Sequence, residues 1–452
     1  MPNVILIVVD DVHVTQVATG LGEDDGYPAP LDITMTPALQ KMAEEGVTMK
    51  IGYSANPMCW PSRGSVITGR YPRRWGDGTK VPVDELWASE YLKTIGYKTA
   101  CIGKWHLRWN DKSVDTFKPL ARGFDEFFGF LAGAHSYYLL EDNSTPVGKK
   151  QGPIFDGHEP ATEDDLLRTK APYNDVYAGD PSDLEKHPWY LTEELTAQTL
   201  DFIDRNHEDP FFIYLAYNAR HTPGEVPDHF RERLTGEGSP TQETQAAMVL
   251  AVDDGVDEIY KKLESFGIAD NTLVIFVGDN GGPANANRNG EPNQPFKGKK
   301  GDGWEGGKRI PFLVKWPKGL PAEGEAQASY PYPVMHIDVV PTILAAVGME
   351  IPEKLDGTDL LPYLRGEKTS DPHTSLHWNS TARMGKWKYF QDSKKGNLLF
   401  DLEADPLEEN NVIDANPEVA KEMDALVVAY MEETGRPGSK DGEDEEEEES
   451  DE

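Results

Sequence analysis

The sequence predicts an α/β protein with a large, mainly parallel sheet flanked by helices, followed by a smaller C-terminal α+β subdomain that contains an antiparallel sheet. Two observations predict this class. Short apolar runs rich in β-branched or aromatic residues alternate with longer segments whose apolar residues recur at helical spacing. After residues 365–367 this alternation gives way to several short segments and one last helical pattern. Alternating strands and helices are typical of parallel sheets.

The expected elements follow in chain order. Strands of the large sheet are expected at four apolar runs too short for helices, residues 4–9, 98–102, 211–217 and 272–277. Helices are expected at residues 37–45, 84–95, 189–205 and 241–266, three of which stop at a glycine. The C-terminal part predicts strands at 375–378, 387–391 and 398–402 and a helix at 417–433. We expect a large domain over 1–367, a subdomain over 368–436 and a disordered acidic tail over 437–452.

The chain is strongly acidic. Its 452 residues include 79 acids and 44 bases, which gives a formal net charge of −35. Such a surface argues against nonspecific binding to nucleic acid or to anionic membranes and suits solubility in salty water. No apolar stretch approaches the roughly 20 residues that span a bilayer, so a soluble protein without membrane association is expected.

The N-terminus and the cysteines bear on the cellular location of the protein. The apolar run at residues 4–9 leads directly into Asp10 and predicts a strand rather than a signal peptide. A periplasmic or secreted location is expected if a signal peptide has been removed, and a cytoplasmic one if the sequence is complete. Two cysteines, Cys59 and Cys101, are too few for a disulfide scaffold. Cys101 lies within an expected strand and should be a buried apolar side chain.

Polar residues follow the expected strands of the large sheet, where open α/β sheets bind ligands. These residues are Asp10, Asp11, Lys104, His106, His221, Asp279 and Asn280. Carboxylate and amide oxygens without a nearby cluster of histidines and cysteines favour calcium or magnesium over zinc. Taken singly, each residue has an ordinary alternative, because such acids often cap helices, lysines lie at the surface and histidines pack in cores.

The segment around Cys59 predicts an anion site. Pro61 suits the first turn of a helix, and that helix would present its positive end to the thiol. Free backbone N–H groups at a helix start and the guanidinium of Arg63 both favour a negatively charged oxygen. A structural or redox thiol of low pKa is the alternative.

From Cys59 to Arg70 the sequence resembles the signature of the formylglycine-dependent (type I) sulfatases, Cys-x-Pro-Ser-Arg followed by Thr-Gly-Arg. The resemblance implies an alkaline-phosphatase-like fold and conversion of Cys59 to formylglycine (3-oxoalanine) by a maturation enzyme. One hydroxyl of the hydrated aldehyde then attacks sulfur, and the other expels sulfate by rebuilding the aldehyde. The family's usual ion is calcium, with magnesium the less expected choice. Its ligands map onto Asp10, Asp11, Cys59, Asp279 and Asn280.

The remaining catalytic positions also follow from the resemblance. The Gly-Lys-x-His element supplies Lys104 for sulfate and His106 for the elimination that restores the aldehyde, and Arg63 belongs to the anion site. A His-x-Pro element places His221 near the leaving-group oxygen. The loop 297–311 resembles a family segment in which the aligned cation is Lys300, with Lys299 and Lys297 as neighbouring alternatives. That cation would stabilise developing charge on the leaving group, an effect of roughly 100- to 1000-fold.

The resemblance extends to about residue 430 and includes residues 385–389, 399–406 and 409–411, which we expect to hold the subdomain in place. The expected substrate is a sulfated carbohydrate or an aryl sulfate. Residues of the pocket mouth should set specificity, and the candidates are His135, Ser136 and Trp378, with further aromatic residues such as Trp109. Two alternatives stay open: a phosphate or phosphonate monoester hydrolase of the same superfamily, and a non-catalytic binder of sulfated glycans.

Overall fold

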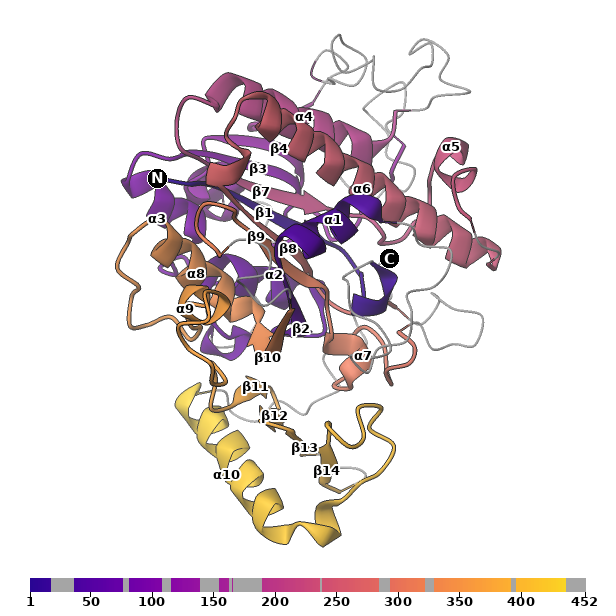
Figure 1. The fold of residues 1–452 in the computed structure, drawn as a ribbon, viewed down its shortest axis with the longest axis vertical. Helices are drawn as coiled ribbons and strands as arrows, with labels where there is room; N and C mark the ends of the chain where they lie inside the picture. The colour runs from indigo at the N-terminus through magenta and orange to yellow at the C-terminus, as the bar shows by residue number, and fades with distance from the viewer. Residues whose placement is uncertain are drawn as a thin grey trace.

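The computed structural model describes residues 1–17, 36–75, 81–107, 115–138, 154–161, 165, 189–235, 238–283, 293–321, 329–391 and 396–435. Trp109 and the expected acidic tail at 437–452 lie outside these residues. A ten-stranded sheet forms the centre of the described part, in the order β10-β2-β9-β8-β1-β7-β3-β4-β5-β6 (Figure 1). The expected α/β class with a large, mainly parallel sheet is confirmed.

The four strands expected from the sequence are neighbours at the centre of this sheet. They are β1 (Asn3–Val9), β7 (Phe211–Tyr217), β8 (Thr272–Gly278) and β3 (Lys98–Lys104), and each pairs in parallel with its neighbour. The other strands are β2 (Val47–Tyr53), β4 (Glu126–Phe130), β5 (Phe155–Asp156), β6 (Glu159–Pro160), β9 (Phe312–Lys315) and β10 (Ser329–Met335). Of these, β9 runs antiparallel to both β2 and β8. The carboxyl ends of the four central strands therefore meet at one edge.

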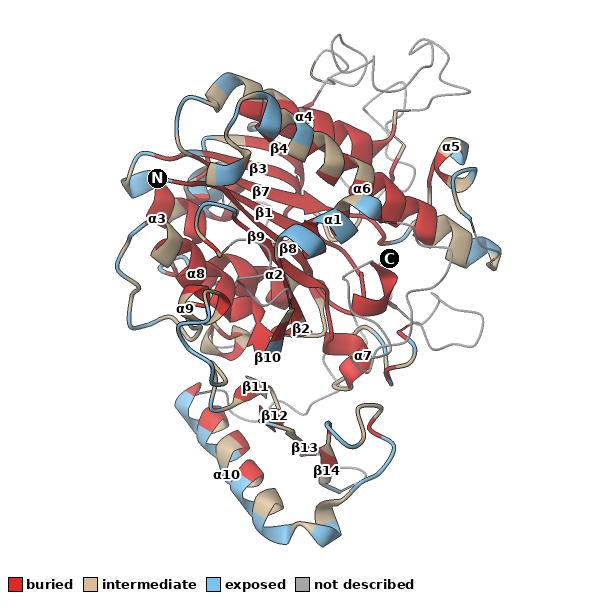
Figure 2. Ribbon diagram, viewed as in Figure 1, coloured by how far each residue is buried: buried red, intermediate tan, exposed pale blue. Residues whose placement is uncertain are grey.

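Helices cover both faces of the sheet. On one face, Ile5 and Ile7 pack with α1 (Pro37–Glu45), α4 (Leu191–Asn206) and α6 (Pro240–Ser265). On the other face, Val4 and Leu6 pack with α2 (Cys59–Thr68), α3 (Ala88–Thr94), α8 (Val339–Ala346) and α9 (Leu361–Leu364). Figure 2 shows the central strands buried and the outer helical surfaces exposed. Side chains of one strand point alternately to the two faces of the sheet. Because helices cover both faces, all of these side chains are buried and the run at residues 4–9 is continuously apolar.

The C-terminal part forms a separate small sheet below the main one in Figure 1. Its antiparallel strands are β11 (Leu376–Trp378), β12 (Thr381–Met384), β13 (Trp387–Phe390) and β14 (Leu398–Asp401). Helix α10 (Pro417–Glu433) packs on this sheet through Met423 and Val427.

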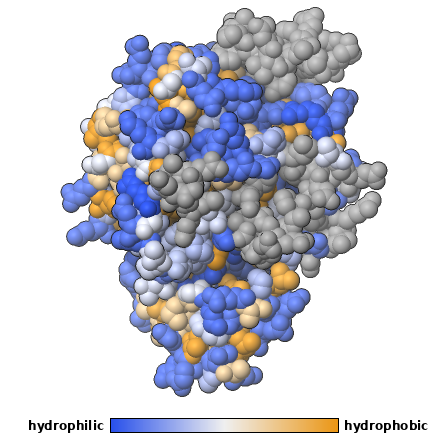
Figure 3. Space-filling model, in the orientation of Figure 1, coloured by the Kyte–Doolittle hydropathy of each residue, from blue (hydrophilic) through white to orange (hydrophobic). Residues whose placement is uncertain are grey.

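Two short helices, α5 (Asp228–Arg231) and α7 (Glu305–Lys308), lie in loops of the large sheet. Among the described helices, none is long and apolar enough to cross a membrane. The described surface in Figure 3 is mostly hydrophilic.

Candidate active site

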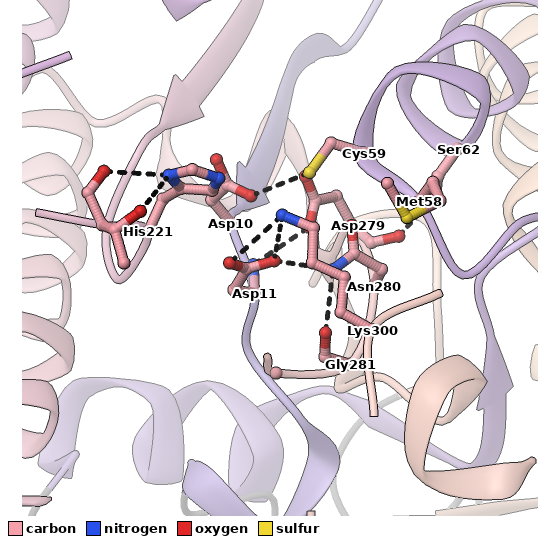
Figure 4. A network of polar contacts seen from close by, with 12 residues as sticks. Asp10, Asp11, Met58, Cys59, Ser62, His221, Asp279, Asn280, Gly281 and Lys300 are labelled. Atoms are coloured by element: carbon pink, nitrogen blue, oxygen red, sulfur yellow. Dashed lines mark hydrogen bonds and ion pairs between the residues drawn. The ribbon is translucent and has the colours of Figure 1, made fainter. Parts of the chain in front are cut away.

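The carboxyl ends of β1 and β8 bring the expected oxygen ligands together. The backbone N–H of Asp11 donates to Oδ1 of Asp279 at 3.0 Å, and Nδ2 of Asn280 donates to Oδ1 of Asp11 at 2.7 Å. The side chains of Asp10, Asp11, Asp279 and Asn280 are all buried. Figure 4 shows them converging with His221 and Lys300, which approach from other loops. Residues almost 270 positions apart in the sequence thus form one polar cluster.

Cys59 lies at the start of α2 and faces the carboxylates. The helix begins at Cys59 itself, contains Pro61 in its first turn and ends at Thr68, before Gly69, whose φ of 72° suits a glycine. The expected helix with its positive end at the thiol is therefore present. Sγ of Cys59 lies 3.5 Å from Oδ1 of Asp10. Burial raises the pKa of this thiol despite the opposing charges of Lys104 and Lys300, so the unmodified side chain is protonated and a poor nucleophile.

The cluster contains the donors that a hard cation requires. Potential ligand atoms of Asp10, Asp11, Cys59 and Asp279 all lie within 4.8 Å of one another. The Oδ1 atom of Asn280 is buried without a hydrogen-bond partner among the described residues, although its Nδ2 donates to both Asp11 and Gly281. A smaller group of Asp10, Cys59 and His221 has the same spacing. Because oxygens dominate the larger set and Asn280 leaves one oxygen unused, the residues fit calcium or magnesium better than zinc.

Arg63 and Lys104 neutralise the carboxylates of this cluster. Both are fully buried, and Nε of Arg63 lies 2.9 Å from Oδ2 of Asp279, while Nζ of Lys104 bonds to Oδ2 of Asp10. A second guanidinium nitrogen of Arg63 lies 3.6 Å from Asp10. Burial alone would raise the pKa of Asp10, but Lys104 and then His221 and Arg63 hold it well below its ordinary value. Burial and the charge of Asp10 raise the pKa of Asp279 to about 7.

The structure distinguishes the three lysines that the sequence left open. Nζ of Lys300 lies 3.1 Å from Oδ1 of Asp11 and is therefore part of the cluster. Nζ of Lys297 instead lies 3.6 Å from the ring centroid of Trp304 and donates to the carbonyl of Glu408. The backbone of Lys299 forms a turn with Asp302, with Asp302 Oδ2 accepting its N–H. Lys300 is the lysine whose ammonium reaches the cluster.

Two histidines flank the cluster. The ring of His221 is oriented by its Nδ1, which lies 2.9 Å from the carbonyl of Thr222 and donates to it. Burial, with the charge of Lys104, lowers the pKa of His221. Burial and the charges of Lys104 and Arg63 likewise hold the pKa of His106 well below its ordinary value. His106 has a φ of 49°, in the left-handed region, and its ring lies against Gly133.

Comparison with known proteins identifies the family. A family model described as Sulfatase matches residues 2–349. The chain belongs to the sulfatase family. Family members are sulfuric ester hydrolases, so the chain is an enzyme of this class, as the sequence predicted. A second model, described as N-sulphoglucosamine sulphohydrolase, C-terminal, matches residues 303–433 of this sulfatase.

Relatives of this sulfatase cover most of its length. An uncharacterized sulfatase of Escherichia coli (strain K12), YdeN, is 27% identical over 96% of this chain and 86% of that protein. An N-acetylgalactosamine-6-sulfatase of Sus scrofa is 31% identical over 86% of this chain and 71% of that protein. Among solved structures, Ps i-CgsB in complex with k-i-k-neocarrahexaose superimposes with a TM-score of 0.80 and 29% identity, over 100% of this chain and 97% of that one.

The three substrate candidates of this sulfatase pack against neighbouring residues, and the ring of His135 lies 5.1 Å from that of Phe130. His135 and Ser136 are buried, and Oγ of Ser136 donates to Oε2 of Glu225 at 2.9 Å. Trp378 is also buried in β11, where its indole N–H donates to the carbonyl of Ser54 at 2.8 Å and its ring packs edge-on against Tyr53. These contacts give each residue a packing role, and their contact with substrate stays a prediction.

Sequence reasoning missed a supporting contact beneath the site. Oγ of Ser62 contacts both the carbonyl of Asp279 and, at 2.8 Å, Nδ1 of His336, so its single hydroxyl proton is shared between two acceptors. The other ring nitrogen of His336 lies 2.8 Å from the carbonyl of Gly278. His336 is fully buried, and burial lowers its pKa to about 3, so the neutral ring links the start of α2 to the end of β8. His336 follows β10, which the sequence pattern did not predict as a strand.

Proposed function

We propose that this sulfatase hydrolyses sulfate esters of carbohydrates through a formylglycine made from Cys59, with a calcium ion held by Asp10, Asp11, Asp279 and Asn280. One observation carries the proposal. Cys59, the first residue of α2, faces buried oxygen donors at a helix start, and one of those donors, Oδ1 of Asn280, has no partner among the described residues. This combination supports a site for a cation and an anionic ester together.

The cation and the modified side chain supply the chemistry that an unmodified thiol lacks. Bound calcium would attract the anionic sulfate group and lower the cost of negative charge on the hydroxyl that Cys59 acquires after conversion. The protein's part is to fix these groups in place. Arg63 spans Asp10 and Asp279 and so keeps the two carboxylates in register, because one rigid guanidinium reaches both.

The basic residues around the cluster have distinct proposed tasks. Lys104 forms an ion pair with Asp10 and, from the same position, would bind the sulfate group. Lys300 approaches from a different loop, where its ammonium would stabilise negative charge developing on the leaving oxygen. His221, oriented by the Thr222 carbonyl, would lie near that oxygen, and the neutral ring of His106 would accept the proton released when the aldehyde is restored.

A carbohydrate substrate is supported by the relatives. Ps i-CgsB, similar over the whole chain, was crystallised with a neocarrahexaose, and the Sus scrofa relative is named for an N-acetylgalactosamine sulfate, although other mammalian relatives are named steryl-sulfatases. We propose a sulfated sugar for this chain on that basis. Alanine changes at His135, Ser136 and Trp378 test the pocket mouth, since a residue that contacts the sugar should alter KM for a sulfated saccharide and leave aryl sulfate turnover intact.

Peptide mass spectrometry tests the mechanism directly. The tryptic fragment that contains Cys59 covers residues 51–63. Protein made in a host with a maturation enzyme should show a loss of about 18 Da at Cys59, or nearly none if the aldehyde is hydrated. The same sample should release sulfate from an aryl sulfate, with calcium and not after chelation. An unmodified Cys59 without sulfate release would refute the proposal.

Paired substrates distinguish the alternatives. A sulfatase should turn over an aryl sulfate faster than the matching aryl phosphate or phosphonate under the same conditions. The reverse order would favour a phosphate or phosphonate monoester hydrolase. Tight binding of a sulfated oligosaccharide without turnover of any ester, by protein with mature formylglycine, would favour the non-catalytic binder.

A further inference from the structure

The loop that carries Lys300 is bonded directly to the active site. Its backbone N–H at Lys300 donates to the carbonyl of Gly282 at 2.9 Å, and the N–H of Gly301 donates to the carbonyl of Pro57 at 3.0 Å. Gly282 follows the ligand turn after β8, and Pro57 precedes Cys59. A displacement of residues 297–308 would therefore move the Lys300 ammonium relative to both the cation ligands and the nucleophile.

The opposite side of this loop is held by the C-terminal subdomain. Oε2 of Glu408 accepts a hydrogen bond from the backbone N–H of Glu305, the first residue of α7, at 2.8 Å. Nζ of Lys388, in β13, lies 2.6 Å from Oε1 of Glu305 and 2.8 Å from Oε1 of Glu408. All three side chains are at most 1% exposed. We call Glu305, Lys388 and Glu408 the clamp.

Stability alone is a poor explanation for the clamp. The contacts among these three charges must offset the desolvation of each, even though Glu305 is also contacted by Arg309 at 3.2 Å and by the Tyr53 hydroxyl at 2.6 Å. Well-packed apolar residues often stabilise such a position better. Glu408 also has a φ of 58°, in the left-handed region that side chains disfavour. Burial raises the pKa of Glu408, so its partners only partly compensate the carboxylate. The energetic cost of the buried charges and of the backbone of Glu408 is consistent with a requirement that the clamp hold the loop in one position.

A second contact between the small sheet and residues 297–308 also restrains this loop. Trp304 immediately precedes Glu305, and its ring packs on Phe390 and Phe400 of the small sheet, with centroids 4.9 and 5.7 Å away. The N–H of Gly306 donates to the carbonyl of Lys297 at 2.7 Å and so closes the loop. Residues on both sides of Lys300 are thus fixed by the clamp and its neighbours.

We propose that Lys388 and Glu408 are positioning residues for the reaction: by holding Glu305 they keep the Lys300 ammonium at the leaving-group oxygen. The C-terminal subdomain then contributes to catalysis although none of its clamp residues touches substrate. This inference rests on the function proposed above, in which Lys300 stabilises the leaving group.

The kinetic test compares aryl sulfates whose leaving phenols differ in pKa. Glu408→Gln keeps the size of the side chain and an acceptor for the Glu305 N–H, but removes the charge that Lys388 holds. We expect kcat/KM to fall about 10- to 100-fold for poor leaving groups and to stay within about 2-fold for good ones, as for a displaced charge stabiliser. Glu408→Asp should show a smaller change of the same kind. The matched control is Lys386→Met, which removes the partly exposed ion pair between Lys386, in the turn before β13, and Asp401 of β14.

A double mutant identifies the group through which the clamp acts. In a Lys300→Ala background, Glu408→Gln should cause no further loss with poor leaving groups, because the displaced ammonium is already gone. Losses that multiply, or a loss equal for all leaving groups, would overturn the proposal. Thermal unfolding of each variant shows that the protein compared is folded.

Hydrogen exchange tests the clamp without any activity. In Glu408→Gln, amides of residues 297–308 should exchange faster than in the wild type, and in Lys386→Met they should not. Unchanged exchange would overturn the proposal even if the wild type released no sulfate, which would separately refute the proposed function. Faster exchange without a change in leaving-group dependence would show that the clamp is only a structural contact. That result would also overturn the proposal.

Discussion

Gly133 leaves the space that the ring of His106 occupies, and filling that space should misplace the ring. A Cβ atom at position 133 would lie 2.8 Å from Nε2 and 2.9 Å from Cε1 of His106. Optimal contacts between such atoms are about 3.5–4.0 Å, so Gly133→Ala should push the ring by about 0.5–1 Å. The buried Nδ1 atom of His106 has no hydrogen-bond partner among the described residues, so no bond at that atom opposes the movement.

The expected loss follows from this displacement. A catalytic group misplaced by about 1 Å can cost about 100-fold in rate. Overpacking against a side chain should cost about 1–3 kcal/mol of the free energy of unfolding, and a protein of this size should remain folded. In the proposed mechanism His106 acts after the leaving group has departed. The first turnover should therefore stay fast while later turnovers become slow.

Stopped-flow release of the aryl alcohol measures both phases. Gly133→Ala should give a burst equal to the concentration of mature enzyme, followed by a steady state about 10- to 100-fold slower than the wild type. Gly224→Ala is the matched control, because among the described residues a Cβ there meets only Cγ2 of Thr244, at an ordinary 3.4 Å. A folded, mature Gly133→Ala enzyme with a wild-type steady-state rate would refute the reasoning. Loss of the burst itself would place His106 in the first step.

Other predictions concern the lysine, the ligands and pH. Lys300→Ala should lower kcat about 100- to 1000-fold for poor leaving groups, whereas Lys299→Ala should change it by less than about 2-fold, as steady-state assays would measure. Asn280→Leu removes a ligand oxygen and the donor to Asp11, so calorimetry should show calcium binding weakened about 10- to 100-fold; unchanged binding would exclude Asn280 as a ligand. The pKa of Asp279 is raised to about 7 in the cation-free protein, so below pH 7 calcium must displace a proton. Calcium affinity should then rise with pH up to about 7 and level off above, and an affinity that is flat from pH 5.5 to 7 would contradict this titration. The same raised pKa makes this group's contribution to the stability of the cation-free protein fall as pH rises from about 4 to 7.

The elements predicted well from the sequence are strands buried on both faces, because their apolar runs are unbroken and end where polar residues begin. Strands β1 and β7 are buried on both faces, and their unbroken apolar runs end where polar residues begin. Because these strands are parallel neighbours, the polar residues at their ends had to meet at one edge. Asp10 and His221 could therefore be placed together from the sequence alone, although 211 positions separate them.

Other strands lack such a pattern. Strand β10 contains Pro331 and Pro333, which read as a loop and are tolerated here because β10 is an edge strand. Strand β9 has only four residues and runs antiparallel between two other strands. The helix expected from residue 84 begins at Ala88, where Glu90 accepts the N–H of Trp87 and so caps it.

The clamp shows why side-chain pairing escaped sequence reasoning. The resemblance pointed to residues 409–411, yet Glu409 is exposed and the neighbouring Glu408 is fully buried. Lys388 lies among residues expected to be structural, and nothing in its local pattern distinguishes it from the half-buried Lys386. Both depend on Glu305, 83 and 103 positions away. A contact of that range leaves no periodic signal, because its partners lie in three separate segments: α7, β13 and the loop after β14.

The acidic chain meets its anionic substrate with a site whose own charges nearly cancel. Three buried carboxylates face three cations: Asp10, Asp11, Asp279, Arg63, Lys104 and Lys300. The repulsion from a net charge of −35 is screened within about 8 Å, so attraction must arise at short range. In the proposed site it arises from the added cation and the N–H groups at the start of α2, because Arg63 and Lys104 are engaged with carboxylates. Without those two cations the clustered carboxylates would raise one another's pKa further and hold protons in place of calcium. Cation and sulfate ester must then favour each other's binding, since each supplies charge that the other lacks.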